Sequence, residues 1–480
     1  MAASSSSAVE RRIRRSDPST IQDKFLVGYQ GWFTCGGDGE PVGPAKDITV
    51  GYTGSTTQYL TADDPTPTYG PTSLRTLHRS STQHQVSKPA QANRPFSFPH
   101  ETPKPYKGAH FHWMAEHGID GAFLQRFAGQ TDIEYGNEGI RKIRDEVGDR
   151  VREAAEKEGR VFAIMYDVSG VPADRIATVL ERDWAHLVRV KGVLDSPNYL
   201  REKGKPVIAL WGFGFEGANH TPSLLRSIIS HIRNVTPGGA YIMAGVPAHW
   251  RTSEGDADRN PEFVDVWLND VDALSPWTIG RYSNEIEADR FAESRMKGDS
   301  ELLRKRVEEG HKKVDYVPVV FPGGSGFNLS EGKWGFNGIK RNGGRFLWKQ
   351  VYNAKKFGVR TMYGAMWDEY DEGTAFMPVV SHKRLLPQSD KYQFMALDED
   401  GYDLPPDWYM RICGFAAEVL HDERRLFETF PSKELQDYWS SRPKYEDVPV
   451  HVQPAASGSG AGGTADDGKP KPAGQSYEEC

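Results

Sequence analysis

The run TMYGAMWDE at residues 361–369 decides the predicted fold, because it is a short apolar stretch that ends abruptly in acids. Seven further apolar runs resemble it, and helical patterns separate most of them. The eight runs span residues 25–32, 119–127, 161–167, 206–213, 240–246, 273–279, 316–321 and 361–369. This alternation is typical of successive β-α units around a parallel sheet. We therefore predict an α/β fold of the (β/α)8 barrel type, with an open doubly wound sheet as the alternative.

The helical patterns fit residues 140–159, 173–190, 221–233, 301–312 and 345–357, with Gly159 and Gly358 where C-terminal caps are expected. Residues 22–430 form the predicted barrel. Residues 1–21 and 431–480 are predicted to be disordered tails, since the first is Ser-rich and then basic and the second is largely Pro, Gly, Ala and Ser. Residues 33–110, polar and rich in Thr, Pro, Ser and Gly, predict a long functional loop after the first strand.

Composition excludes several classes of partner. The formal net charge of −7 offers no basic field for a polyanion, so we expect neither nucleic acid nor an anionic membrane surface as a partner. The three cysteines, Cys35, Cys413 and Cys480, lack metal-site or disulfide spacing, and no metal or cofactor is expected. Residues 1–20 contain no apolar run long enough for a signal peptide, and no later stretch has the length of a membrane span. We therefore expect a soluble, cytoplasmic protein. Secretion, including secretion by an unconventional route, is the alternative.

Candidate binding residues were sought at the ends of the runs, because barrel enzymes collect their reacting groups at the C-terminal ends of the strands. Aromatic side chains stand beside acids there, as in a carbohydrate cleft, and core packing is the alternative for each ring. Two further candidates, a histidine and a tryptophan, precede the second strand. The predicted oligosaccharide-binding residues are Tyr29, Trp32, His112, Trp113, Arg126, Tyr166, Asp167, Trp211, Trp277, Trp367 and Asp368.

Four carboxylates crowd the end of the last run: Asp368, Glu369, Asp371 and Glu372. Cleavage of a glycosidic bond needs two carboxyl groups in different protonation states, and mutual repulsion favours keeping one of them protonated. Gly373 permits a sharp turn that places two glutamates on the same side of a cleft. The alternative is a solvated acidic turn.

The segment Glu369-Tyr370-Asp371-Glu372-Gly373-Thr374 resembles the Glu-Trp-His-Glu-Gly-Thr motif of glycoside hydrolase family 99, the endo-α-mannosidases, and of related barrels grouped with the family 71 α-1,3-glucanases. Residues 28–33 are similar to that family's aromatic first strand, and Tyr199 with residues 205–208 resembles its approach to the fourth strand. The likeness spans about residues 22–430. Tyr370 and Asp371 stand where the motif has Trp and His, which leaves the two glutamates intact.

The resemblance implies metal-free, retaining hydrolysis of an α-linked sugar. Glu372 matches the family's general acid/base. Glu369 matches the partner that deprotonates the sugar's own 2-hydroxyl, whose oxygen then displaces the leaving group. Both glutamates are therefore predicted to be catalytic.

Two other functions were weighed. A barrel that binds glycans without cleaving them does not need two glutamates three residues apart. A metal-dependent amidohydrolase would use His110 and His112, completed by His249 and Asp368. That histidine pair precedes the second run instead of ending the first, which argues against the metal enzyme.

Overall fold

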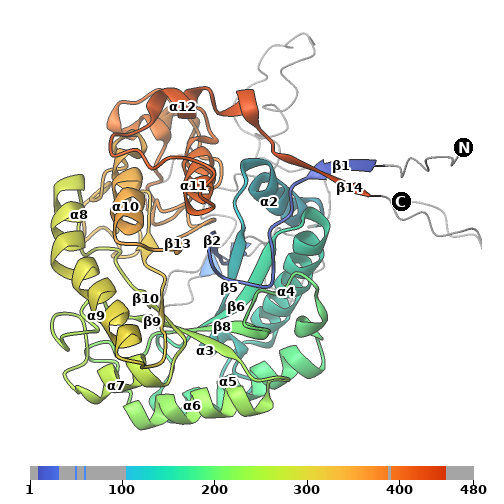
Figure 1. The fold of residues 1–480 in the computed structure, drawn as a ribbon, viewed down its shortest axis with the longest axis vertical. Coiled ribbons are helices and arrows are strands. Elements are labelled where there is room, and N and C mark those ends of the chain that lie inside the picture. Colours follow the sequence, from blue (N-terminus) through green and yellow to red (C-terminus); the bar gives the residue numbers. More distant parts are fainter. Residues whose placement is uncertain (1–8, 32–48, 51–58, 61–103, 387–390, 450–480) are drawn as a thin grey trace, which may run out of the picture. The chain divides into compact units, whose positions relative to one another are not determined.

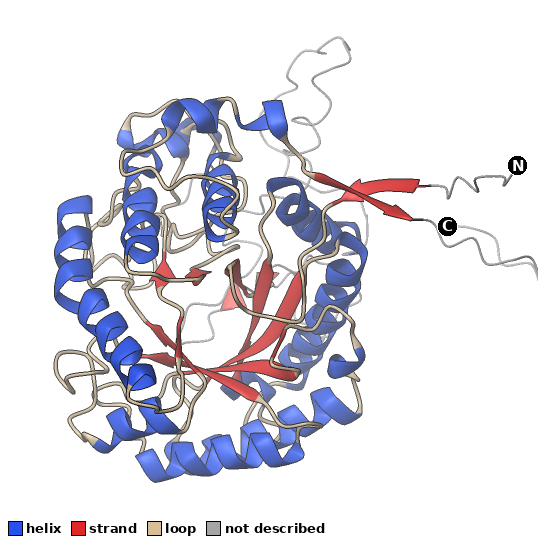
Figure 2. Ribbon diagram, viewed as in Figure 1, coloured by secondary structure: helices blue, strands red, loops and turns tan. Residues whose placement is uncertain are grey.

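A computed structural model describes residues 9–31, 49–50, 59–60, 104–386 and 391–449. The chain divides into two compact units, residues 13–446 and residues 1–12 with 447–480. The described part of the smaller unit belongs to a two-stranded sheet of β1 (Val9–Ile13) and β14 (Tyr445–Pro449). The larger unit holds a parallel sheet surrounded by helices (Figures 1 and 2).

The sheet of the larger unit runs in the order β11-β10-β9-β8-β6-β5-β2-β13-β12, and every neighbouring pair in this order is parallel. Its strands correspond to the eight predicted runs. Their bounds are β2 Lys24–Tyr29, β5 Gly121–Phe127, β6 Val161–Asp167, β8 Lys205–Trp211, β9 Tyr241–Val246, β10 Ala273–Pro276, β11 Asp315–Tyr316, β12 Val319–Val320 and β13 Thr361–Gly364. A short strand, β7 (Arg201–Glu202), pairs antiparallel with β8.

The seventh run closes the barrel. Its first half, β11, pairs with β10, and its second half, β12, pairs with β13. Pro318, which has no N–H to donate, lies between the two halves. The two ends of the sheet order are therefore parts of one continuous segment, and the barrel fold is confirmed over the open-sheet alternative.

Helices cover the outside of the barrel. They are α2 Lys104–His117, α3 Ala128–Thr131, α4 Glu138–Glu158, α5 Ala173–Arg189, α6 Pro222–Val235, α7 Glu262–Asn269, α8 Glu285–Phe291, α9 Lys297–Glu308, α10 Arg345–Lys356, α11 Trp408–Leu420 and α12 Ser432–Gln436. Asn137 and Thr221 cap α4 and α6 by accepting from backbone N–H groups. Gly159, with a φ of 63°, ends α4 as predicted. No helix in the described residues has the length and apolar character needed to span a membrane.

The prediction of disordered tails is wrong where the structure describes them within the larger unit. Ile21 is 2% exposed in the core, and the Ser16 hydroxyl donates to Asp120 over 2.8 Å. At the other end, Leu435 of α12 and Tyr438 are fully buried. These few apolar anchors outweigh the polar composition around them, because each buries its side chain against the barrel.

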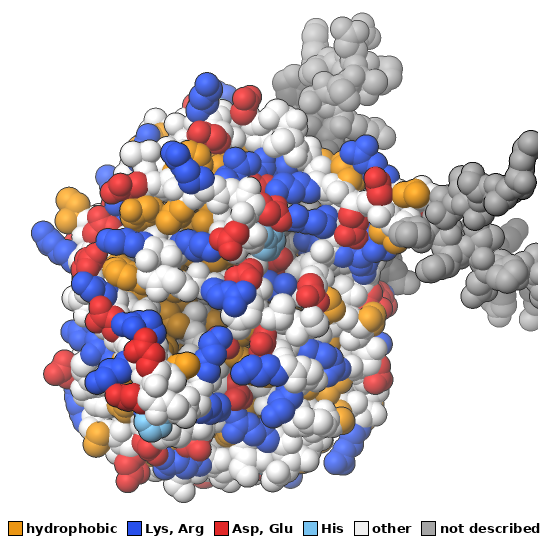
Figure 3. All heavy atoms as spheres, in the orientation of Figure 1, with side chains coloured by type: hydrophobic (Ala, Val, Ile, Leu, Met, Phe, Trp, Pro, Cys, Tyr) orange, Lys and Arg blue, Asp and Glu red, His pale blue; other side chains and the backbone are white. Residues whose placement is uncertain are grey.

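Most of the predicted loop after the first strand lies outside the described residues. Its described pieces are the short antiparallel pair β3 (Thr49–Val50) and β4 (Tyr59–Leu60) and the helix α2. On the face seen in Figure 3, Lys and Arg are interspersed with Asp and Glu instead of forming a field of one sign.

Candidate active site

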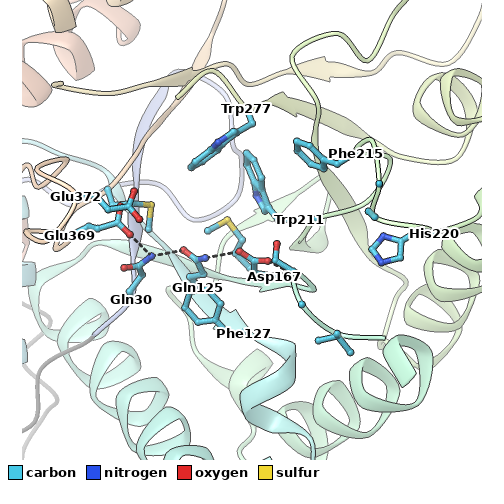
Figure 4. A pocket seen from close by; sticks show the side chains of 18 of the residues that line it. Gln30, Gln125, Phe127, Asp167, Trp211, Phe215, His220, Trp277, Glu369 and Glu372 are labelled. Atoms are coloured by element: carbon cyan, nitrogen blue, oxygen red, sulfur yellow. Dashed lines mark hydrogen bonds between the residues drawn. The ribbon is translucent and has the colours of Figure 1, made fainter. Parts of the chain in front are cut away.

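A cavity of about 730 Å³ opens at the C-terminal ends of the strands, where barrel enzymes place their sites. Two glutamates stand on one side, the indoles of Trp211 and Trp277 lie in the middle, and Phe215 and His220 lie opposite the glutamates (Figure 4). Its lining includes Gln30, Gln125, Phe127, Met165, Asp167, Trp211, Phe215, Glu216, His220, Trp277, Tyr363, Met366, Glu369 and Glu372. Five predicted site residues therefore meet here: Asp167, Trp211, Trp277, Glu369 and Glu372.

The acidic loop brings the two glutamates together through a tight turn. The strand β13 ends at Gly364, so the predicted strand to residue 369 is too long. The N–H of Thr374 donates to the carbonyl of Glu369 over 3.1 Å. Gly373 has a φ of 65°, and a Cβ there would lie 2.4 Å from the sulfur of Met395. This left-handed conformation favours glycine, and a side chain here would also have to displace the end of Met395.

Glu369 is 9% exposed, and its carboxyl group accepts two hydrogen bonds. The Thr374 hydroxyl donates to its Oε2 over 2.8 Å, and Nε2 of Gln30 donates to its Oε1 over 3.2 Å. Burial raises the pKa of Glu369 above its usual value, and these two bonds limit the rise. The bonds thus favour the carboxylate form of this side chain.

Glu372 lies in the same cavity without such support. No described residue donates a hydrogen bond to its carboxyl group, and burial raises its pKa well above the usual range. The charges of Glu369 and Asp371 raise this pKa further. The pKa of both glutamates is raised, and only Glu369 has hydrogen-bond donors that limit the rise, so a proton shared between them is favoured on Glu372.

Asp368 and Trp367 do not line the cavity, and their prediction as binding residues is corrected. Asp368 is fully buried and accepts from the backbone N–H groups of Gln30 and Gly31, over 3.0 and 2.7 Å. Burial raises the pKa of this carboxyl to about 7. Trp367 is also fully buried and meets His110 edge to face, with ring centroids 6.4 Å apart. Both residues fasten the acidic loop to its neighbours.

Arg126 and Tyr166 are likewise outside the cavity, because successive strand residues point to opposite faces of a sheet. Gln125 and Asp167 point into the barrel, so their neighbours point out toward the helices. The Arg126 guanidinium donates to both carboxylate oxygens of Asp183, over 2.6 and 2.7 Å, and the Tyr166 hydroxyl donates to the same group over 2.7 Å. These residues join sheet to helix instead of binding a ligand.

The remaining predicted aromatic and histidine residues lie behind or beside the site. Tyr29 is buried with its hydroxyl 3.1 Å from Nδ1 of His110, and Trp113 stacks on that same imidazole. His112 is half-exposed on α2, where hydrogen bonds with Glu116 and Glu158 raise its pKa to about 10. Tyr29, Trp113 and His112 are therefore corrected as cavity residues. Trp32 lies outside the described residues.

Several lining residues were not predicted. Strand alternation identifies Gln125 and Met165, because they lie two residues before Phe127 and Asp167, which also line the cavity. Phe215 and His220 come from the loop after β8, where the sequence carries no periodic pattern. Trp211 and Trp277 meet edge to face with centroids 5.1 Å apart.

The amidohydrolase alternative does not match the positions of its histidines. His110 contacts Tyr29, His112 contacts two glutamates on the outer face, and His249 lies 2.7 Å from Asp256. In the parts of the chain that the structure covers, no group of three or more His, Cys, Asp or Glu side chains is arranged to hold a metal ion.

Comparison with solved structures shows the fold. The family 99 endo-α-mannosidase from Bacteroides thetaiotaomicron, in complex with bis-tris propane, superposes with a TM-score of 0.51 at 13% identity, covering 84% of this chain and 99% of that one. A second structure of the enzyme from that organism gives a TM-score of 0.49 at 13% identity, with the same coverage. No protein-family model and no curated protein sequence matches. The structural neighbours are glycoside hydrolases, and the predicted distant likeness to family 99 is confirmed as a likeness of fold.

Proposed function

We propose that this protein is a retaining glycoside hydrolase that cleaves an α-linked glycosidic bond. The observation that carries the proposal is the pair Glu369 and Glu372, which share one cavity but receive unequal hydrogen bonding. The barrel fold shared with a family 99 endo-α-mannosidase supports it. Trp211 and Trp277 provide apolar ring faces of the kind that pack against sugars.

In the proposed reaction, the Glu369 carboxylate takes the proton of the sugar's 2-hydroxyl. The freed oxygen attacks the anomeric carbon and closes a three-membered ring, the bond to the leaving oxygen breaks, and Glu372 gives its proton to that oxygen. In the second half, the Glu372 carboxylate takes a proton from water. The water oxygen opens the ring at the anomeric carbon, and Glu369 returns its proton to the 2-oxygen. The anomeric configuration is retained after two displacements.

The charge of the cavity indicates a neutral glycan. Asp167, Glu216, Glu369 and Glu372 line it, and no Lys or Arg stands among the described residues of the lining. Glu216 pairs with Arg259 over 3.1 Å, but Asp167, Glu369 and Glu372 pair with no Lys or Arg among the described residues. A uronic acid, sulfate or phosphate beside these three carboxylates would therefore meet uncompensated negative charge. We therefore include uncharged oligosaccharides in the proposal and exclude acidic ones.

The test is turnover of a panel of aryl α-glycosides and neutral α-linked oligosaccharides. In Glu372→Gln, kcat should fall about 10²- to 10⁴-fold, since general acid catalysis contributes that much. An activated aryl leaving group should reduce this loss, because it needs less protonation. Glu309→Gln, at the exposed residue directly after α9, is the matched control and should keep full activity.

A non-catalytic glycan-binding barrel predicts a different result. It would bind glycans with equal affinity before and after Glu372→Gln and would turn over none of them. That outcome would reject hydrolysis, whereas loss of turnover with retained sugar affinity supports it.

A further inference from the structure

Two glutamine side chains connect the proposed base to a carboxylate on another strand. Nε2 of Gln30 lies 3.2 Å from Oε1 of Glu369 and 3.1 Å from Oε1 of Gln125, and Nε2 of Gln125 lies 3.0 Å from Oδ2 of Asp167 (Figure 4). This amide bridge, Gln30 with Gln125, starts in the loop after β2 and runs over β5 to the end of β6. Its members line the cavity, and sequence reasoning predicted neither amide.

The hydrogen bonds of the bridge fix which way each amide group faces. Both hydrogens of the Gln30 amide are donated, one to Glu369 and one to Gln125, and the Gln125 amide is donated to Asp167. Rotating the Gln30 amide by half a turn would place its oxygen against two other acceptors. A carboxyl group at either end can therefore stay an acceptor only while both amides keep this direction.

The Gln30 amide is buried, with the residue 3% exposed, and no described residue donates to its Oε1. Its nitrogen makes the two bonds that connect Glu369 to Gln125. Hydrogen bonds to an ionised acceptor are the stronger kind, and a Glu369 carboxylate supplies one.

Asp167, at the end of the bridge remote from Glu369, fixes the orientation of the Gln125 amide. Its Oδ1 accepts from the backbone N–H of Ser169 over 2.8 Å, a donor whose direction the backbone fixes. Its Oδ2 receives the Gln125 amide, which leaves Oε1 of Gln125 facing Gln30. Burial raises the pKa of Asp167, and the bonds from Ser169 and Gln125 oppose that rise.

We propose that Gln30 and Gln125, oriented by Asp167, are positioning residues that keep Glu369 ionised and aimed at the substrate. This inference rests on the proposed function, in which Glu369 must be ionised to act as the base. It replaces the predicted role of Asp167 as a group that binds a sugar hydroxyl. Asp167 and Gln125 act on the base through the bridge, since their bonds reach Glu369 only by way of Gln30.

The test is a ¹³C NMR titration of Glu carboxyl carbons in the full-length protein, with the Glu369 signal identified by its absence in Glu369→Gln. Gln30→Met should raise the pKa of Glu369 by about one unit, because a direct donor to the charged form is lost. Gln125→Met should raise it by about half a unit, although Gln125 carries no charge and does not touch Glu369.

The matched control is Gln350→Met. Gln350 is a buried amide on α10 that bonds Phe321 and Tyr282 and lies outside the cavity lining. Its loss should lower the melting temperature about as much as the loss of Gln125 while leaving the pKa of Glu369 unchanged. If Gln125→Met does not fold, Gln125→Asn, one methylene too short to span the bridge, takes its place.

An unchanged pKa of Glu369 in a folded Gln125 variant would overturn the proposal, and so would an equal rise in Gln350→Met. The titration needs no turnover, so its outcome is independent of the activity panel. If the pKa of Glu369 rises in the variants but no glycan is hydrolysed, the positioning role of the two glutamines is supported and the hydrolase function is rejected.

Discussion

Two groups of carboxylates in the larger unit have pKa values that shift in opposite directions. Glu372 in the cavity has no cationic partner among the described residues, and its pKa is raised by burial. Glu418 on α11 is 4% exposed, yet its bonds with Arg424, Arg442 and Lys444 outweigh burial and lower its pKa. Burial alone therefore does not mark a functional acid. Glu369 and Glu372 differ from Glu418 in that no Lys or Arg of the described residues pairs with them.

The largest expected effect comes from removing the charge in the paired group. In Glu418→Gln, Arg442, whose side chain is 3% exposed, loses its carboxylate partner and remains buried. We expect the free energy of unfolding at pH 7 to fall by about 3–5 kcal/mol. Urea unfolding followed by tryptophan fluorescence measures it. If the free energy of unfolding falls by less than for an ordinary surface substitution, the cationic partners of Glu418 do not stabilise its charged form.

The same variant should also change how stability depends on pH. The pKa of Glu418 is lowered by folding, so its contribution to stability is present above its unfolded pKa of about 4.3 and is lost as pH falls through the lower folded value. The difference between wild type and Glu418→Gln should therefore shrink below about pH 4.

A second substitution tests whether Arg126 belongs to the paired group and not to the cavity. Arg126→Lys replaces a guanidinium that bonds both oxygens of Asp183 and also reaches Asp145 over 2.6 Å. The single ammonium of lysine cannot reproduce this geometry, and a loss of about 1–3 kcal/mol in unfolding free energy is expected. KM for the best substrate should not change. A selective rise in KM without loss of stability would restore the original prediction that Arg126 binds the sugar.

The sequence predicted the barrel well, because apolar runs and helical patterns are local signals. It predicted Glu369 and Glu372 in one cavity from the acidic motif and Gly373. It did not separate Gln125 from Arg126 or Asp167 from Tyr166, although the two-residue strand period contains that information. Barrel closure through the divided segment 315–320 depends on pairing between distant strands, so no local pattern reveals it.

Replacing the cavity acid should have the opposite effect on stability. The pKa of Glu372 is raised by folding, so its protonated form stabilises the protein below the unfolded pKa of about 4.3, and this contribution is lost as pH rises through the folded value. Glu372→Gln should therefore lose less stability than wild type between pH 5 and pH 8, as judged by melting temperatures at several pH values. A steeper loss in the variant would contradict the raised pKa.

The smallest expected effect concerns Asp371, which lies in the acidic loop but not in the cavity lining. Its charge is one cause of the raised pKa of Glu372, after burial and the charge of Glu369. Asp371→Asn should lower the pKa of Glu372, and because Glu372 must be protonated to act as the acid, the alkaline limb of the pH profile of kcat/KM should move to lower pH. The acidic limb, which reports the ionisation of Glu369, should move in the same direction and less far, since its pKa depends mainly on burial and on the bonds from Thr374 and Gln30. An alkaline limb that does not move would mean that Glu372 is not the group whose deprotonation ends activity.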